Sequence, residues 1–314
     1  MPETVLITGG AGFIGSHAAT RLAARGSRVV VLDNFCDFYD PAIKRARAER
    51  LVKLNVVVRE GDIRDSGVVR ALHEEFRPDA VVHIAAMAGV RPSIENPKLY
   101  AEVNVDGTVN MLDAAASFGV KRLVFASSSS VYGNNEKVPF SEDDPVDEPI
   151  SPYAATKRAC ELLCHTYWAL HKLPVFCMRF FTVYGPSQRP DLAISKFMRM
   201  IDAGEEIPYF GDGTSSRDYT YIDDIVDGLM AALERCDRFR IYNLGGSSPV
   251  TLTQLVEAIE KVVGKKARLD RRPAQAGDVE RTFADLTRSR AELGYEPHVA
   301  LGEGLRRQWE ARKG

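Results

Sequence analysis

Long apolar runs are absent from this 314-residue sequence. No stretch reaches the roughly 20 consecutive apolar residues that a helix needs to cross a bilayer. An export signal is also lacking, because Thr4-Val-Leu-Ile-Thr8 at the N-terminus already has the pattern of a buried strand leading into a glycine turn. We therefore expect a cytoplasmic protein that makes no use of a membrane.

The sequence has no excess of charge of one sign. It contains 41 Lys and Arg against 43 Asp and Glu, a formal net charge of -2. Binding to nucleic acid or to an anionic membrane depends on clustered positive charge, which this balance does not favour. We expect small-molecule partners rather than nucleic acid or membrane.

Cysteine is scarce, and its five copies are scattered. An odd number without an export signal predicts reduced thiols and no disulfide framework. Cys160 and Cys164 lie four apart on an expected helix, beside His165. A metal site would need two more ligands at suitable spacing, and the sequence offers none. We expect this pair to pack in the core and the protein to bind no metal.

What the sequence does contain is a series of short β-branched runs that alternate with amphipathic segments. Continuous apolar runs are typical of strands covered on both faces, and parallel strands need crossover helices. The pattern predicts an α/β fold with a doubly wound parallel (Rossmann) sheet. The expected strands are 4–8, 28–33, 55–59, 80–84, 122–126 and 174–179, with 240–244 as a further candidate, and the expected helices include 13–25, 105–118 and 152–171.

The regular alternation breaks up near residue 179, where Pro, Gly and charged residues become more frequent. We predict a cofactor domain from residues 1–179 together with about 214–245. Residues 180–213 and 246–314 would form a smaller C-terminal substrate lobe over the carboxyl edge of the sheet, where such folds bind ligands.

A glycine-rich turn, Thr8-Gly-Gly-Ala-Gly-Phe-Ile-Gly15, follows the first strand. Glycines here allow a tight turn, let backbone N–H groups approach a pyrophosphate, and bring the helix close to the sheet. Asp33 ends the second strand, where a carboxylate accepts hydrogen bonds from ribose hydroxyls and repels a 2′-phosphate. The pattern therefore favours NAD over NADP. The alternative is the same fold without a nucleotide.

We expect the cofactor to contact residues at the ends of successive strands and in the helices that follow. Asp62 would meet the adenine amino group, and the small residues after the fourth strand would leave room for the cofactor. The predicted cofactor contacts are Gly9, Gly12, Phe13, Ile14, Gly15, Asp33, Asn34, Asp62, Ile63, Ala85, Ala86, Met87, Asn104, Ser127, Tyr153, Lys157 and Phe180.

Ser151-Pro-Tyr-Ala-Ala-Thr-Lys157 opens a helix, with Ser151 as the expected N-cap. Tyr153 and Lys157 are four apart and share one helix face. A tyrosine has an ordinary pKa near 10, and a nearby ammonium together with oxidised nicotinamide would lower it toward working pH. A serine of the hydroxyl row Ser127–Ser130, which follows a sheet strand, would donate to the substrate hydroxyl. An exposed Tyr–Lys pair is the alternative interpretation.

Taken together, these motifs resemble the extended short-chain dehydrogenase/reductase family from the first strand to the last helix. Within that family the chain is most similar to the UDP-glucuronate 4-epimerases. The similarity rests on Asp33-Asn-Phe-Cys-Asp-Phe-Tyr-Asp-Pro41, Ala85-Ala-Met-Ala-Gly-Val-Arg91, Arg179-Phe-Phe-Thr-Val-Tyr-Gly-Pro186 with Arg189-Pro-Asp-Leu-Ala193, and Ser216-Arg-Asp-Tyr-Thr-Tyr-Ile-Asp-Asp224.

The resemblance implies a mechanism in which Tyr153 removes the proton of the sugar 4-OH while the C4 hydride passes to NAD⁺. The resulting 4-keto sugar rotates and receives the hydride on its other face. The catalytic residues implied are Ser128, Tyr153 and Lys157. The implied substrate contacts are Ser129, Ser130, Thr182, Arg189, Ala193, Ile207, Tyr209, Arg217, Gln275 and Asp278.

Arg189 decides between acidic and neutral sugars in this interpretation. The family places this arginine near the C6 carboxylate, and Thr182 replaces the Asn usual in relatives that act on neutral sugars. A solvated loop charge is the alternative for Arg189, and a 4-epimerase of neutral UDP-hexoses is the alternative for the chain. A 4,6-dehydratase, a UDP-glucuronate decarboxylase and a non-catalytic NAD-sensing protein are further alternatives. Apolar stripes on 100–118 and 152–171 suggest a homodimer, although they also suit an internal core.

Overall fold

The computed structural model describes residues 4–273 and 279–313. Two predicted substrate contacts, Gln275 and Asp278, lie outside the described residues. In the part that is described, no helix combines the length and apolarity needed to span a membrane.

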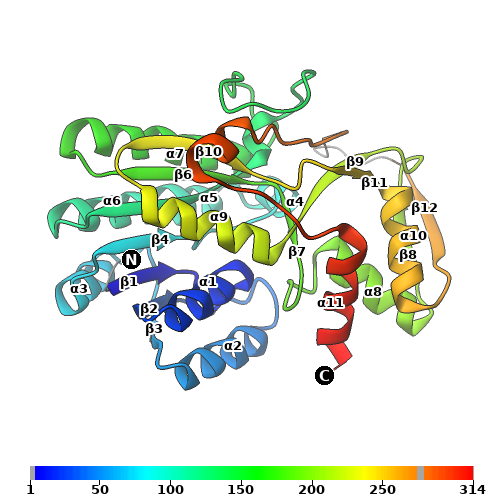
Figure 1. Cartoon of the computed structure of the whole chain (residues 1–314), viewed down its shortest axis with the longest axis horizontal. Coiled ribbons are helices and arrows are strands. Elements are labelled where there is room, and N and C mark those ends of the chain that lie inside the picture. Colours follow the sequence, from blue (N-terminus) through cyan, green and yellow to red (C-terminus); the bar gives the residue numbers. More distant parts are fainter. Residues whose placement is uncertain (1–3, 274–278, 314) are drawn as a thin grey trace.

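A seven-stranded parallel sheet forms the centre of the larger lobe (Figure 1). Its strand order is β10-β6-β5-β4-β1-β2-β3, which reverses direction at β1 as a doubly wound fold requires. The strands are β1 (Thr4–Thr8), β2 (Arg28–Asp33), β3 (Val57–Glu60), β4 (Ala80–His83), β5 (Arg122–Ser128), β6 (Val175–Phe180) and β10 (Phe239–Leu244). The predicted fold class is confirmed, and all seven expected strands are present with bounds shifted by at most two residues.

Helices cover both faces of this sheet, and each face has its own apolar core. One face carries α1 (Phe13–Ala24) and α9 (Ile222–Arg235), with α2 (Pro41–Lys53) beside β3. The other face carries α3 (Ser66–Phe76), α6 (Gly107–Ser117) and α7 (Pro152–His171). The short helices α4 (Val90–Glu95), α5 (Pro97–Tyr100), η1 (Ala101–Asp106) and η2 (Ser129–Tyr132) connect the larger elements.

The predicted start of α7 is confirmed in atomic detail. Ser151 is extended and its side chain accepts from the backbone N–H of Ala154 at 3.2 Å, while Pro152 is the first helical residue. This cap places the first turn of α7, which carries Tyr153, directly against the carboxyl end of β5.

A smaller lobe stands beside the carboxyl edge of the sheet (Figure 1). It contains a three-stranded sheet of β11 (Pro249–Thr251), β9 (Ser216–Tyr221) and β7 (Thr182–Tyr184), and a two-stranded sheet of β12 (Arg268–Arg272) and β8 (Glu206–Phe210). The helices of this lobe are α8 (Ala193–Ala203), α10 (Leu252–Val263) and α11 (Leu301–Lys313).

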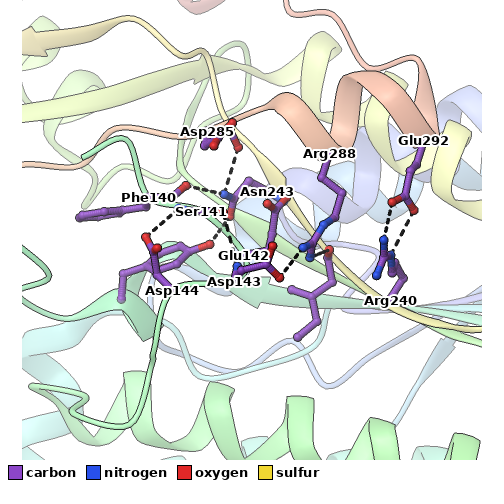
Figure 2. Close-up of polar contacts among 12 residues, drawn as sticks. Phe140, Ser141, Glu142, Asp143, Asp144, Arg240, Asn243, Asp285, Arg288 and Glu292 are labelled. Carbon is purple, nitrogen blue, oxygen red and sulfur yellow. Dashed lines mark hydrogen bonds and ion pairs between the residues drawn. The ribbon is translucent and has the colours of Figure 1, made fainter. Parts of the chain in front are cut away.

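Asn243, buried near the end of β10, joins three segments that are distant in sequence (Figure 2). Its amide nitrogen donates to the carbonyls of Phe140 at 2.8 Å and Asp285 at 3.1 Å, and its amide oxygen accepts from Tyr132 at 2.6 Å. Its backbone N–H donates to the carboxylate of Glu142 at 2.7 Å. A buried network whose polar groups are hydrogen-bonded holds its members in one geometry. Asn243 therefore anchors Tyr132 and with it η2, which carries Ser129 and Ser130.

The segment that includes η3 (Ser289–Leu293) packs against the larger lobe as well (Figure 2). Glu292 accepts from Arg240 of β10 at 2.5 Å, and Arg288 donates to Asp143 at 2.5 Å. Meanwhile β9 pairs with β7 and β11 in the smaller lobe. The division into a cofactor domain and a substrate lobe stays a prediction, and on these contacts we propose to include β9 in the substrate lobe and residues 285–295 in the cofactor domain.

Candidate active site

A cavity of about 360 Å³ opens at the carboxyl ends of β1, β2, β4, β5 and β6. Parallel strands place their carboxyl ends at one edge, so residues far apart in sequence meet there. The predicted residues that line this cavity are Gly9, Gly12, Phe13, Ile14, Gly15, Asp33, Asn34, Ile63, Ala85, Ala86, Met87, Ser127, Ser128, Tyr153, Lys157, Phe180, Thr182 and Arg189.

The glycine turn fits a dinucleotide because its chain packs tightly on neighbouring backbone and leaves no room for side chains at its glycines. Gly9 has a φ of +69°, and a Cβ there would lie 2.8 Å from the backbone nitrogen of Ala85. Gly12 caps α1 without a side-chain hydrogen bond. The first-turn N–H groups of α1, at Phe13 and Ile14, are therefore free to meet a pyrophosphate.

Gly15 offers a direct test of this turn. A Cβ at Gly15 would overlap the carbonyl oxygen of Gly9 and lie 2.7 Å from the Cα of Gly10, so the backbone of the turn would have to shift. We expect Gly15→Ala to abolish retention of NAD and to cost about 1–3 kcal/mol of stability. Gly302→Ala is the control, since its Cβ would meet no atom within 4 Å. Release of NAD on denaturation, read by absorbance, measures the effect; retention of NAD by Gly15→Ala at the wild-type level would contradict it.

The carboxylate of Asp33 is held in place at the end of β2. It accepts from the backbone N–H groups of Ala11 at 3.1 Å and Phe35 at 2.9 Å, and the ammonium of buried Lys44 lies 3.5 Å away. Burial alone would lower the pKa of Lys44, but Asp33 and Cys36 raise it above its usual value. The ammonium therefore stays charged beside Asp33.

Sequence reasoning did not assign Lys44 or the segment 35–40 to the site. Cys36, Phe38 and Tyr39 nevertheless line the cavity. The segment is held there by Arg47, which donates to Tyr39 at 3.0 Å and to the carbonyl of Ser187 at 2.6 Å. The aromatic residues Phe38 and Tyr39, within the stretch Asp33–Pro41, were the available signal. Their position at the cavity depends on the contact of Arg47 with Ser187, which is 140 residues away in sequence.

Two predicted cofactor residues, Asn104 and Asp62, do not line the cavity but hydrogen-bond residues that do. The amide of buried Asn104 accepts from the N–H of Met87 at 2.8 Å and donates to its carbonyl at 3.1 Å, so Asn104 fixes the wall segment through Met87. Asp62 accepts from Asn34 at 3.0 Å and from Arg64 at 2.8 Å, and its pKa is lowered to about 2, chiefly by Arg64.

Tyr153 and Ser128 meet at the inner end of the cavity. Burial raises the pKa of Tyr153, while a hydrogen bond with Ser128 and the positive charge of Arg189 lower it. Ser128 also accepts from the N–H of Ser130 and donates to its hydroxyl, both at 3.1 Å. The hydroxyls of Ser130 and Ser128 are therefore connected to each other and to the phenol of Tyr153, and Ser129 lies beside them in η2.

Lys157 donates to the carbonyl of Ala126 at 2.7 Å, and burial lowers its pKa to about 8. In this structure the positive charge that lowers the pKa of Tyr153 is that of Arg189, and the role predicted for Lys157 together with oxidised nicotinamide stays a prediction. His83, buried beneath, bridges the hydroxyls of Thr8 at 2.6 Å and Thr108 at 3.0 Å. Burial, helped by Lys157, lowers the pKa of His83 to about 3, so His83 is a neutral structural link.

Arg189 lines the cavity together with Thr182, the first residue of β7. Its guanidinium pairs with the carboxylate of Asp191 and lies 4.8 Å from the ring centroid of Phe38. The structure thus brings the predicted carboxylate contacts Arg189 and Thr182 into the same cavity as Tyr153.

The remaining predicted substrate contacts lie in the smaller lobe and do not line this cavity. Ala193 is exposed at the start of α8, and Ile207 is buried in β8. Tyr209 is buried and hydrogen-bonds Thr253 at 2.6 Å, and Arg217 donates to the carbonyl of Ser216 at 2.9 Å. Their role as contacts of a nucleotide stays a prediction.

The sheet, the glycine turn and the carboxylate at the end of β2 define a Rossmann-type protein with a dinucleotide site. Residues 5–245 match the NAD dependent epimerase/dehydratase family, and the chain belongs to that family. NAD is its cofactor.

Known proteins similar to this chain include UDP-glucuronate 4-epimerase 5 of Arabidopsis thaliana, 46% identical over 97% of this chain and 74% of that protein. A solved UDP-glucuronic acid 4-epimerase of Bacillus cereus, in complex with UDP-glucuronic acid and NAD, is 33% identical with a TM-score of 0.93, covering 99% of each chain. A solved UDP-glucose 4-epimerase of Thermotoga maritima, with UDP-glucose, is 32% identical with a TM-score of 0.91, covering 99% of this chain and 98% of that one.

Proposed function

We propose that the protein is a UDP-glucuronate 4-epimerase that interconverts UDP-glucuronate and UDP-galacturonate. The observation that carries the proposal is Arg189, a cation in the same cavity as Tyr153, Ser128 and Thr182. Relatives up to 46% identical over nearly the whole chain, and a solved neighbour with UDP-glucuronic acid and NAD, support it.

When bound, NAD would supply the acceptor and donor of the C4 hydride. The glycine turn and the first turn of α1 would hold its pyrophosphate, and Asp33 would hold its adenosine ribose. The phenol of Tyr153 takes the proton of the sugar 4-OH and gives it back to the 4-keto sugar, with the hydroxyl of Ser128 donating to the same oxygen. Lys157, which also lines the cavity, would hold the second ribose.

A serious second candidate is 4-epimerisation of neutral UDP-hexoses, because the Thermotoga maritima UDP-glucose 4-epimerase shares the fold with a TM-score of 0.91. Incubation with UDP-glucuronate and with UDP-galactose separately, reading the C4 stereochemistry by NMR, tests the two. Inversion of UDP-glucuronate supports the proposal, and inversion of UDP-galactose alone overturns it. Bound NAD with no turnover of either sugar would leave a non-catalytic NAD-sensing protein.

Arg189 carries a specific prediction about the 4-keto intermediate, which is a β-keto acid able to lose CO₂. Loss of CO₂ is fastest when the C5–C6 bond aligns with the C4 carbonyl π system, and we propose that Arg189 and Thr182 hold the carboxylate where that overlap is poor. A charge-assisted contact is worth roughly 1.5–3 kcal/mol. We expect Arg189→Ala to reduce the preference for UDP-glucuronate over a neutral UDP-hexose by about ten- to hundredfold and to release UDP-4-keto-pentose. Mass spectrometry of the products decides: loss of affinity without decarboxylated product would remove the alignment hypothesis.

We also propose that the protein is cytoplasmic and a homodimer. The five cysteines form no disulfide with one another in the described structure. Leu162 and Leu170 on α7 and Ile94 on α4 are exposed apolar side chains at 52%, 76% and 52%. Apolar exposure on helices at one side of the sheet favours pairing with a second copy. Light scattering of the purified protein tests this.

A further inference from the structure

The guanidinium of Arg189 already has a carboxylate partner. Its Nε donates to Oδ1 of Asp191 at 3.0 Å and its Nη2 donates to Oδ2 at 2.7 Å, which is the two-pronged geometry a sugar carboxylate would use. Its Nη1 makes no hydrogen bond within the described residues. The ring of Phe38 lies against the guanidinium, 4.8 Å from its central carbon, and Tyr39 follows at 5.9 Å.

The two partners of this ion pair differ in their access to water. The side chain of Arg189 is 16% exposed and lines the cavity, whereas that of Asp191 is 42% exposed and is not among the described residues that line it. Burial alone would lower the pKa of Arg189, and Asp191 more than offsets this, so the guanidinium stays charged. A largely buried cation such as Arg189 needs an anionic partner. A carboxylate as exposed as that of Asp191 can be hydrated instead of paired at little cost in free energy.

We propose that Asp191 is a specificity-determining residue that competes with the substrate carboxylate for Arg189. The inference rests on the proposed function, because it needs a sugar acid whose carboxylate meets Arg189. An acidic sugar then exchanges one carboxylate for another at the guanidinium, while Phe38 keeps the guanidinium plane in place. A neutral sugar leaves the Arg189–Asp191 pair intact.

If Asp191 competes with the substrate for Arg189, it weakens substrate binding, whereas it would strengthen binding if it only held Arg189 in position. Because Arg189 gains one carboxylate and loses another, only part of its attraction for the sugar acid is realised as affinity. Removing the negative charge of Asp191 should therefore strengthen binding of the acidic substrate. The same change should leave neutral substrates unaffected, since they make no demand on Arg189.

The experiment is Asp191→Asn, assayed with UDP-glucuronate and with UDP-glucose as substrate or competitive inhibitor. Because a partly exposed ion pair contributes little free energy, we expect the KM of Asp191→Asn for UDP-glucuronate to fall by about two- to fivefold. We expect kcat for UDP-glucuronate to stay within about twofold and the KM or Ki for UDP-glucose to stay unchanged, since the Asn changes only the competition for Arg189. The control is Asp202→Asn, an aspartate 46% exposed that pairs with Lys265 at the C-terminal end of α8, and we expect no change with either sugar.

The other outcomes contradict either the inference or the proposed function. A rise in the KM for UDP-glucuronate would overturn the inference, because Asp191 would then hold Arg189 in its working position. Equal changes for both sugars, or no change for either, would overturn it too. If wild-type protein fails to invert UDP-glucuronate at all, the proposed function falls with it; if wild type is active and Asp191→Asn binds UDP-glucuronate no tighter, only the competition is wrong.

Discussion

Replacing Tyr153 by Phe should reduce kcat for C4 inversion by about 10²- to 10⁴-fold, the range that a positioned general acid–base supplies. The change removes one oxygen atom and leaves the ring, which packs edge-on against Tyr100 with centroids 6.2 Å apart. Burial holds the pKa of Tyr153 above its usual value, and Ser128 and Arg189 act against that shift. The phenol of Tyr100 is committed to the carbonyl of Ala88 at 2.9 Å, and that of Tyr39, which also lines the cavity, accepts from Arg47 at 3.0 Å.

The measurement is the rate of UDP-galacturonate formation by NMR, with NAD content and UDP affinity determined on the same preparation. NAD and UDP binding should be unchanged, because Phe keeps the shape of the cavity. Tyr167→Phe is the matched control: it lies on the same helix, and its hydroxyl bonds Asp113 away from the cavity. A Tyr153→Phe variant with more than about a tenth of wild-type kcat would contradict acid–base catalysis by this residue.

The second large effect concerns stability. Glu161→Ala should destabilise the protein by about 3–5 kcal/mol, because it leaves a buried cation unpaired. Arg179 is 1% exposed and Glu161 0%, and they are joined by two hydrogen bonds of 2.8 Å. Glu161 also accepts from Ser127 at 2.7 Å, so the change removes a hydrogen bond that holds this cavity residue in place. The Nη1 of Arg179 has no hydrogen-bond partner within residues 4–273 and 279–313 even before the change, so little compensates the loss.

Thermal unfolding with saturating NAD measures this effect, and we expect a decrease in Tm on the order of 10 °C. Glu205→Ala is the control, because Glu205 forms an exposed pair with Arg199 whose loss should cost at most ~1 kcal/mol. The double change Glu161→Leu with Arg179→Met should recover much of the stability, since it removes both buried charges. Equal decreases in Tm for Glu161→Ala and Glu205→Ala would show that the buried pair adds nothing to stability.

Much of the larger lobe could be predicted from local patterns. The β-branched runs 4–8 and 28–33 became β1 and β2 with the same bounds, and the capped segment 152–171 became α7. These patterns succeed because burial on both faces demands continuous apolar residues in a strand, and because a cap acts within one helical turn. That Tyr153 and Lys157 share one face of α7 could likewise be predicted, because residues four apart in a helix always do.

The smaller lobe was harder to interpret because its contacts are set by chain segments far apart in sequence. Ile207 and Tyr209 are buried and do not line the cavity, and their predicted contact with the substrate stays a prediction. Lys44, which the sequence did not single out, sits beside Asp33 because α2 folds back along β3. Local patterns carry no information about which of many charged side chains will meet.

By itself, the sequence determined the doubly wound sheet, the glycine turn for NAD and the serine–tyrosine–lysine set, because each follows from residues close together in the chain or from the strand order. Only the tertiary structure decided what surrounds Arg189. The guanidinium needs a partner because it is half-buried, and which partner it takes depends on how the loop 187–192 folds against Phe38 and Tyr39 from the other side of the cavity. Partner choice for a buried charge is set by desolvation and distance in space, neither of which is written in local sequence.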